Sequence, residues 1–203
     1  MTDPGRVTWA EPGDLAAVAG RVAAELARPR PLRLCVPGGS TAPKVFAMLA
    51  TRGLDWAGVT IMLNDDRRVP DDHRASNHGK LRAALPQVVI ERLVEGAEVA
   101  PFDLVWLGMG EDGHVASLFP HMRAELRPGP HVIATTPIPL PPEAPFDRLS
   151  LNWRALLAAR EVILVVTGEA KRRVIEAALV GADLPVATLF AGAGVPVTIY
   201  WSA

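Results

Sequence analysis

Short apolar runs that are typical of strands alternate with segments of helical periodicity, and no other feature of this sequence restricts the fold as strongly. The strand-like runs lie at residues 32–36, 59–63, 103–107, 131–135, 148–152, 161–166 and 197–201. Several are apolar on both faces, as buried parallel strands are. Helical spacing recurs over residues 15–26 and 171–180. The pattern predicts an α/β fold, a single domain over residues 1–203, with a doubly wound, mostly parallel sheet and helices on both faces.

Composition is consistent with one domain and limits the kinds of ligand. With 203 residues, of which 49% are hydrophobic, the chain can bury one substantial core. Its formal net charge is −1, and acids and bases are mixed along its length. We therefore expect no surface for nucleic acid or an anionic membrane, and any anionic ligand has to be held by a local site.

Three features bear on location. The single cysteine, Cys35, lies in an apolar run and cannot form an intramolecular disulfide, so we expect a buried thiol in a reducing compartment. Residues 1–14 have acids and prolines in place of a basic and then apolar secretory signal. Residues 184–201 are uncharged, but Pro185 and Pro196 bracket a glycine-rich break, which favours a short helix and a strand over a membrane span. We expect a cytoplasmic chain.

Doubly wound sheets bind ligands beyond the carboxyl ends of their strands, so the residues after each run are the candidates. After the first run, Gly38 and Gly39 allow a tight turn, Ser40 or Thr41 can cap a helix, and Pro43 suits its first turn. Such a helix start attracts phosphate through its free N–H groups. An ordinary capped turn is the alternative. The segment lacks the spacing of a Walker A loop.

The second strand-like run is followed by a segment dense in charge, NDDRRVPDDHRASNHG, at residues 64–79. Most such segments are solvated surface. However, Asp65 and Arg67 come directly after the run, where a carboxylate could orient a catalytic group and a guanidinium could hold a phosphate. A zinc site at His73 and His78 is not expected, because their spacing fits no standard pattern and no cysteine or third histidine is near.

The loop GMGEDGHVASLFP, residues 108–120, allows two interpretations. Its GxGxxG spacing matches a dinucleotide-binding turn, but residues 130–135 lack the acid that the fingerprint requires, and the loop follows the third run rather than the first. Alternatively, the glycines bring the backbone close to a ligand, while Asp112 and His114 share a site in which the imidazole takes a proton from water. A structural histidine is also possible, but the loop position favours catalysis.

Two further basic residues are candidates for anion binding. Thr167 and Gly168 open a helix after the run at 161–166, and Lys171 lies in its first turn. A cation there opposes the helix dipole unless an anion compensates, although residues 171–173 could simply form a solvated face. Arg148 begins another run and is a weaker candidate. The proline-rich segment 136–145 is best interpreted as a surface loop.

Five segments, PGGSTAPKVF, DDRRVPDDHRASNHG, FDLVWLGMGEDGHVASLFP, RLSLN and VVTGEAKRRV, occur in an order and spacing that resemble the 6-phosphogluconolactonase family. The resemblance covers nearly the whole chain and is most specific in LGMGEDGHVASLFP. It implies a Rossmann-like fold without a bound dinucleotide. It also implies hydrolysis of 6-phospho-D-glucono-1,5-lactone to 6-phosphogluconate, in the oxidative pentose phosphate pathway, with no metal or organic cofactor.

The matching positions imply roles for individual residues. His114 would be the general base, and Asp65 the acid that orients it or the water. The substrate and its phosphate would be bound by Gly38, Gly39, Ser40, Thr41, Arg67, Gly110, Asp112, Gly113, Arg148 and Lys171. Backbone N–H groups of the glycine loop are the expected oxyanion donors. The chain departs from the family pattern at Asp66, where Glu is usual, at Arg68, where an aromatic residue is common, and at Val115, where threonine is common. These departures concern substrate contacts more than the reaction.

Three alternatives remain. An amino-sugar-phosphate isomerase/deaminase shares the fold, but its loop resembles an Asn-Gly-His run, whereas Asp112 stands in the Asn position here. A non-catalytic sugar-phosphate-binding module could keep Ser40, Thr41 and Arg67 while losing the base, yet His114 is present. An NAD-dependent oxidoreductase is the third. The chain is expected to be a monomer or a small homo-oligomer.

Overall fold

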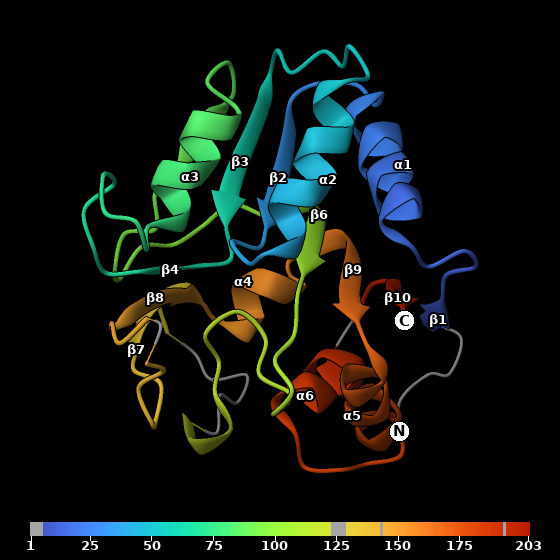
Figure 1. Ribbon diagram of the computed structural model, residues 1–203, viewed down its shortest axis with the longest axis vertical. Coiled ribbons are helices and arrows are strands. Elements are labelled where there is room, and N and C mark those ends of the chain that lie inside the picture. The colour runs from blue at the N-terminus through green and yellow to red at the C-terminus, as the bar shows by residue number, and fades with distance from the viewer. Residues whose placement is uncertain (1–5, 123–128, 143, 193) are drawn as a thin grey trace.

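A parallel sheet of seven strands forms the centre of the molecule (Figure 1). Its order is β1 (Val7–Trp9), β10 (Val197–Ser202), β9 (Ala159–Thr167), β6 (Phe102–Leu107), β2 (Leu32–Val36), β3 (Val59–Leu63) and β5 (Val89–Glu91). Each neighbouring pair runs parallel. The computed structural model describes residues 6–122, 129–142, 144–192 and 194–203. Residues 1–5, which belong to the segment considered as a secretory signal, and Glu143, which belongs to the proline-rich segment, lie outside it.

Helices cover both faces of this sheet. They are α1 (Leu15–Leu26), α2 (Thr41–Ala50), α3 (Asn77–Ala84), α4 (Trp153–Leu157), α5 (Glu169–Leu179) and α6 (Pro185–Gly192). Side chains of β6 alternate between two buried clusters: Leu104 and Trp106 pack with α1 and α2, whereas Val105 and Leu107 pack with α4, α5 and α6. Burial on both faces explains why the strands are continuously apolar, and the predicted doubly wound α/β architecture is confirmed.

A second, antiparallel sheet was not expected. It contains β4 (Asp65–Arg67), β8 (Arg148–Leu151) and β7 (Val132–Thr135), in the order β4-β8-β7. The predicted strands at 131–135 and 148–152 exist, but they pair here and not with the parallel sheet. β4 lies in the charged run, and its side chains are only partly buried, so no apolar pattern marked it. The sequence analysis also missed four other elements. The three-residue strands β1 and β5 and the five-residue helix α4 are too short for a periodic pattern, and α3 has too few apolar residues for one.

The chain reverses its direction of winding between β2 and β6. From β2 it passes through α2, β3 and α3 to β5 at one edge, and β6 then returns to pair with the other side of β2. Loops that leave the carboxyl ends of β2 and β6 therefore diverge and leave a crevice, which is the usual place for a ligand in such sheets.

The expectations about buried segments are met where the structure describes them. Cys35 is fully buried, and burial raises the pKa of its thiol. Residues 185–192 form α6, and residues 197–202 form β10. Within the described residues, no helix is long and apolar enough to cross a membrane.

Candidate active site

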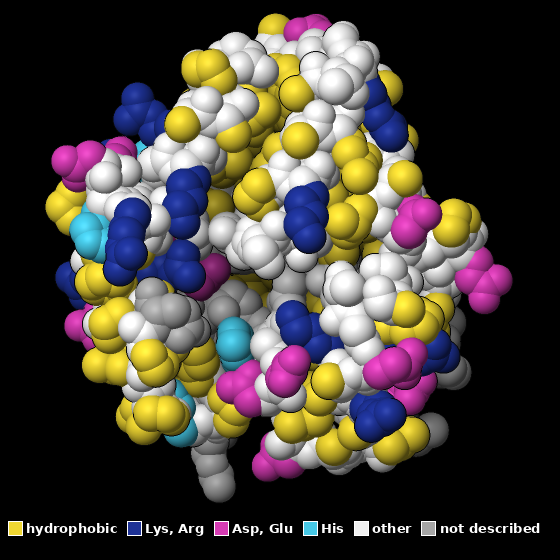
Figure 2. Space-filling view, viewed as in Figure 1, with side chains coloured by type: hydrophobic (Ala, Val, Ile, Leu, Met, Phe, Trp, Pro, Cys, Tyr) yellow, Lys and Arg dark blue, Asp and Glu magenta, His cyan; other side chains and the backbone are white. Residues whose placement is uncertain are grey.

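A cleft of about 640 Å³ lies at the carboxyl ends of β2, β3, β6 and β9. Most of the predicted site residues line it: Gly38, Gly39, Ser40, Thr41, Asp65, Arg67, Gly110, His114, Arg148 and Lys171. Asp112 and Gly113 do not. Residues separated by more than 130 positions in sequence are thus brought to one place by the parallel sheet. Figure 2 shows Lys and Arg side chains gathered around the hollow in the middle of this face.

The charge of the cleft is opposite to that of the whole chain. Its lining contains four cationic side chains, from Lys44, Arg67, Arg148 and Lys171, against one carboxylate, that of Asp65. Among the described residues, none of the four cations forms an ion pair. The starts of α2 and α5 add helix-dipole charge of the same sign. The cleft is therefore suited to an anion.

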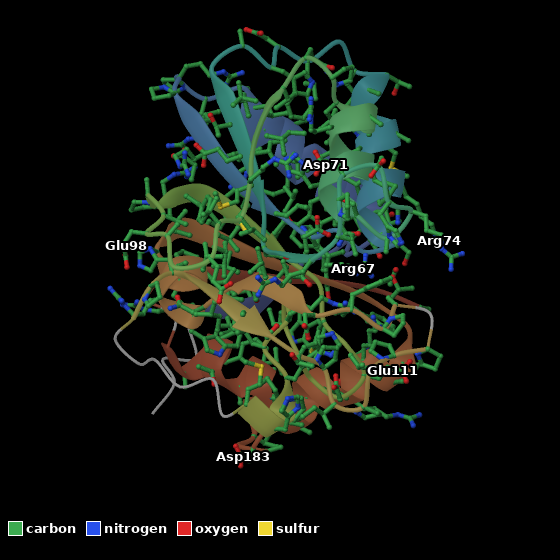
Figure 3. All side chains as sticks on the ribbon, turned by 90° about the vertical axis from the view of Figure 1, so that its left-hand side faces the viewer. Arg67, Asp71, Arg74, Glu98, Glu111 and Asp183 are labelled. Atoms are coloured by element: carbon green, nitrogen blue, oxygen red, sulfur yellow. The ribbon has the colours of Figure 1, made fainter. Side chains whose placement is uncertain are left out.

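Arg67 is held at the cleft by the start of α3. Its Nη1 donates to Asn77 Oδ1 at 2.6 Å and to the Ala75 carbonyl at 3.2 Å, so its charge is oriented without being neutralised. A Cβ on Gly38 would lie 2.1 Å from Asn77 Nδ2, so the glycine makes room for this amide. Sequence analysis missed Asn77 because it lies in a helix that no pattern marked. Figure 3 shows Arg67 in the middle of the molecule, with Arg74 pointing outward.

Arg148 lies directly opposite Arg67 in the small sheet. It is buried and donates to the carbonyls of Phe146 and Ala144. Burial, followed by the Arg67 charge, lowers the pKa of Arg148. Like charges directly opposite each other destabilise a strand pair, so this arrangement favours an anion bound between them.

The two charged departures from the family pattern point away from the cleft. Asp66 accepts from the backbone N–H groups of Arg67, Asn77 and His78, and so caps α3. Arg68 forms a half-exposed ion pair with Glu95 at 3.0 Å. Neither residue lines the cleft, and Asp66 shapes it only by fixing the helix that carries Asn77.

His114 is oriented by Asp112, not by Asp65. Asp112 Oδ1 lies 2.6 Å from His114 Nδ1 and 3.2 Å from the His114 backbone nitrogen. A carboxylate only accepts, so the contact places the imidazole proton on Nδ1 and leaves Nε2 as the basic nitrogen. The Phe119 ring packs against the imidazole, with ring centroids 5.1 Å apart.

Two glycines of the loop, Gly110 and Gly113, allow the backbone to adopt the conformation that positions His114. A Cβ on Gly110 would lie 2.3 Å from the His114 ring and 2.6 Å from Asp112 Oδ1. Gly113 has a φ of +81°, which side chains disfavour. The N–H groups of Gly110 and Gly113 already donate to His114 O and Gly110 O, so these two expected oxyanion donors are engaged within the loop.

Asp65 is the one carboxylate of the cleft lining, and it contacts the loop through Ser117. Ser117 Oγ donates to Asp65 Oδ2 at 2.6 Å. Burial raises the pKa of the Asp65 carboxyl, while the Ser117 hydrogen bond and the Arg67 charge oppose that rise. The sequence left open whether Asp65 orients His114 or the water. No hydrogen bond joins Asp65 to His114 among the described residues, and their interaction is electrostatic across the site.

Two lining residues carry buried polar atoms without a partner. Asn64 Nδ2 donates to the Trp106 carbonyl at 3.2 Å, but Asn64 Oδ1 and Trp106 Nε1 have no hydrogen-bond partner among the residues that the structure describes. Such atoms are costly to bury, so they favour a polar group bound beside them. An uncharged side chain in a charged run, and a tryptophan in an apolar strand, gave no signal in the sequence.

The geometry bears on the metal and dinucleotide alternatives too. No group of three or more His, Cys, Asp or Glu side chains in the described part of the chain is placed to hold a metal ion. β6 leads into a turn and a three-residue 3-10 helix, Pro120–Met122, and not into the helix that a dinucleotide fingerprint places beneath the pyrophosphate.

Comparisons with known proteins show which proteins this chain resembles. The family model of "Glucosamine-6-phosphate isomerases/6-phosphogluconolactonase" matches residues 14–92 and 88–198. A 6-phosphogluconolactonase of Pseudomonas aeruginosa is 33% identical, over 93% of this chain and 89% of the relative. The crystal structure of a 6-phosphogluconolactonase from Shewanella baltica covers both chains fully, with a TM-score of 0.80 and 30% identity. A monomeric glucosamine-6-phosphate deaminase shares the fold, with a TM-score of 0.75 at 18% identity.

Proposed function

The chain belongs to the family of glucosamine-6-phosphate isomerases and 6-phosphogluconolactonases, and on this premise we propose that it hydrolyses 6-phospho-D-glucono-1,5-lactone to 6-phosphogluconate. The observation that carries the proposal is the cleft itself. It combines a histidine whose Nδ1 faces a carboxylate with four cations that have no acidic partner among the described residues. A phosphate and a hydrolysable carbonyl are the two groups that such a cleft suits.

The phosphate is assigned to the cationic part of the cleft. Arg67 and Arg148 flank one side, while the start of α2, with Ser40 and Thr41, and Lys171 of α5 supply further donors. Ser40 occupies the N-cap position of α2, yet its side chain makes no capping hydrogen bond, which leaves the hydroxyl for a ligand. Gly38 and Gly39 let the ligand approach the backbone. Asn64 Oδ1 is the acceptor proposed for a sugar hydroxyl.

The chemistry requires only a base and good positioning. His114 Nε2 takes a proton from water as the water oxygen attacks C1 of the lactone. The ring C–O bond then breaks as the imidazolium returns that proton to the ring oxygen, which gives the C5 hydroxyl and a carboxylic acid that ionises in water. General base catalysis of this kind is worth about 10²–10⁴-fold. Asp112 holds the imidazole, with Gly110 and Gly113 allowing the turn, and Asp65 orients the attacking water.

The proposal extends to the setting of the protein. We place it in the cytoplasm, as a monomer or small homo-oligomer that binds neither nucleic acid nor membrane and needs no cofactor, within a single domain of residues 1–203. The buried free thiol of Cys35 and the mixed surface charge support this assignment.

The test generates the lactone in situ from glucose 6-phosphate and its dehydrogenase, then follows lactone disappearance with and without protein. We expect the wild type to exceed the buffer rate and His114→Ala to lose about 10²–10⁴-fold in kcat. His121→Ala is the matched control, because His121 is exposed and lies outside the cleft lining. A wild-type rate equal to buffer would refute the proposal, and ammonia release from glucosamine 6-phosphate would favour the deaminase instead.

A further inference from the structure

A run of hydrogen bonds connects the small sheet, the histidine loop and Asp65. Ser150 Oγ donates to the Leu151 carbonyl at 3.0 Å and accepts from the Ser117 N–H at 3.1 Å. Ser117 Oγ then donates to Asp65 Oδ2 at 2.6 Å. Both serines are buried, and Ser150 is the cross-strand partner of Asp65. The backbone of Ser117 is thus anchored to the same sheet that carries Asp65.

The loop adopts an unfavourable conformation to reach this position. Ala116 has a φ of +52°, and it is the only residue other than glycine in the described part of the chain with a positive φ. Residues with a Cβ rarely adopt such angles unless the surroundings impose them, and such residues cluster at functional sites. The strained residue, Ala116, directly precedes Ser117, whose hydroxyl donates to Asp65.

The arrangement fixes the carboxylate without covering it. Ser117 occupies Oδ2, whereas Oδ1 of Asp65 accepts from no donor among the described residues, and Asp65 lines the cleft. The charged and titratable groups that act on Asp65 are Arg67 and Asp66 of β4, Arg148 of β8, Cys35 of β2 and His114 of the loop. These groups act on Asp65 through their charge. The Ser117 hydroxyl acts through a hydrogen bond, which is directional, and among the described residues it therefore fixes the direction of the carboxylate.

We propose that Ser117 is a positioning residue for the lactone hydrolysis: it holds Asp65 by Oδ2 so that Oδ1 faces the reacting water. This inference rests on the proposed function. Ser117 touches no reacting atom in this scheme, so its contribution passes entirely through Asp65. That dependence separates it from a serine that merely stabilises the loop.

The test is a double-mutant cycle on kcat with Ser117→Ala and Asp65→Asn. We expect Ser117→Ala to lower kcat about ten- to hundredfold, as for a lost hydrogen bond to a charged group, with KM and the affinity for 6-phosphogluconate unchanged. In the Asp65→Asn background the same change should cost little, since the carboxylate it orients is gone. Ser117→Cys, which keeps a weaker donor, should fall between.

Ser76→Ala is the matched control. It removes another buried serine hydroxyl, one that caps α3 through the Gly79 N–H. It should lower the melting temperature and, because the start of α3 carries Asn77, raise KM, but its effect on kcat should be additive with that of Asp65→Asn. If Ser117→Ala is also additive with Asp65→Asn, or if it raises KM rather than lowering kcat, the positioning role is wrong while the lactonase proposal stands. A wild-type rate equal to buffer would overturn the proposed function, and this inference with it.

Discussion

At Gly110, the absence of a side chain has a cause that only the folded structure shows. The sequence marked this glycine as a place where the backbone approaches a ligand, but a Cβ here would collide with the His114 ring and with Asp112. For Asp65, the sequence left open whether the carboxylate orients His114 or the water, and the structure shows that it accepts a hydrogen bond from the Ser117 hydroxyl. Residue types and their order indicated the chemistry, whereas the identity of each neighbour depended on how the loop folds.

Asp65→Asn should lower activity and raise stability together. Burial raises the pKa of Asp65, so the charged carboxylate destabilises the folded state. The stability that Asp65 contributes is fully present below the unfolded pKa, near 3.8, where the carboxyl is protonated, and it is lost as pH rises through the folded pKa. We expect the variant to have a higher melting temperature than the wild type at pH 7.

The stability difference has a pH signature that thermal denaturation can follow. As pH falls toward the ordinary aspartate pKa, wild-type Asp65 becomes protonated and the advantage of Asp65→Asn should disappear. Asp112→Asn is the comparison, because Asp112 is exposed and should give no such gain. A melting temperature of Asp65→Asn below that of wild type at pH 7 would contradict this account.

Among the elements, α3 contributes most that the sequence did not predict. It follows a charged run that contains one proline, and its few apolar residues gave no periodic pattern, yet Asp66 and Ser76 cap its first turn. That capped start is what places Asn77 beside Arg67. In contrast, α2 was predictable, because Gly38, Gly39 and Pro43 combine a tight turn with a helix start.

Asn77→Ala should weaken substrate binding without slowing the chemistry. Arg67 would lose its carboxamide acceptor and its fixed position, so we expect KM to rise about tenfold while kcat changes little, because a phosphate contact acts equally in the ground and transition states. Asn152→Ala is the control: it removes the N-cap of α4 outside the cleft and should affect only stability. A fall in kcat at constant KM would instead place Arg67 at the reacting carbonyl.

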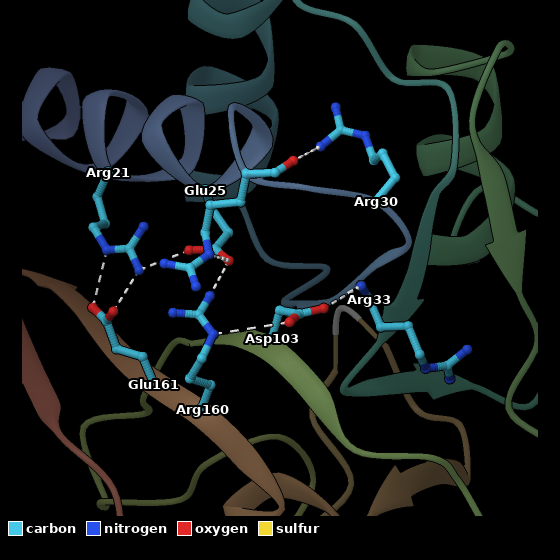
Figure 4. Close-up of polar contacts among 8 residues, drawn as sticks. Arg21, Glu25, Arg30, Arg33, Asp103, Arg160 and Glu161 are labelled. Carbon is cyan, nitrogen blue, oxygen red and sulfur yellow. Dashed lines mark hydrogen bonds and ion pairs between the residues drawn. The ribbon is translucent and has the colours of Figure 1, made fainter.

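Across the whole molecule, binding and stability are concentrated at opposite ends of the parallel sheet. The cleft lies at the carboxyl ends, whereas a network of ion pairs joins α1 to the amino ends of β6 and β9 (Figure 4). In it, the fully buried Glu25 pairs with Arg21, Arg160 and Arg28, and Arg21 also pairs with Glu161. Within the described part of the chain, the cations at the cleft have no acidic partner, whereas those at the other end are paired with carboxylates.

Glu25→Gln should therefore destabilise the protein and spare its activity. Removing the buried carboxylate leaves the arginines around it without their counter-charge, which costs about 3–5 kcal/mol in buried pairs. Glu176→Gln, which breaks an exposed pair with Arg172, should cost less than about 1 kcal/mol. Chemical denaturation measures both, and a loss of kcat/KM in Glu25→Gln greater than in Glu176→Gln would show that the two ends are coupled.

The sequence alone determined the α/β class, the positions of most strands and the segments that form the site. It could do so because burial on both faces of a sheet demands continuous apolar runs, and because ligand-binding residues follow those runs. Only the tertiary structure decided that β4, β7 and β8 form a separate sheet, that Arg67 faces Arg148, and that Asn77 and Ser117 hold the charged residues of the cleft. Most of these contacts join segments far apart in the chain, and none of them leaves a periodic trace in a sequence.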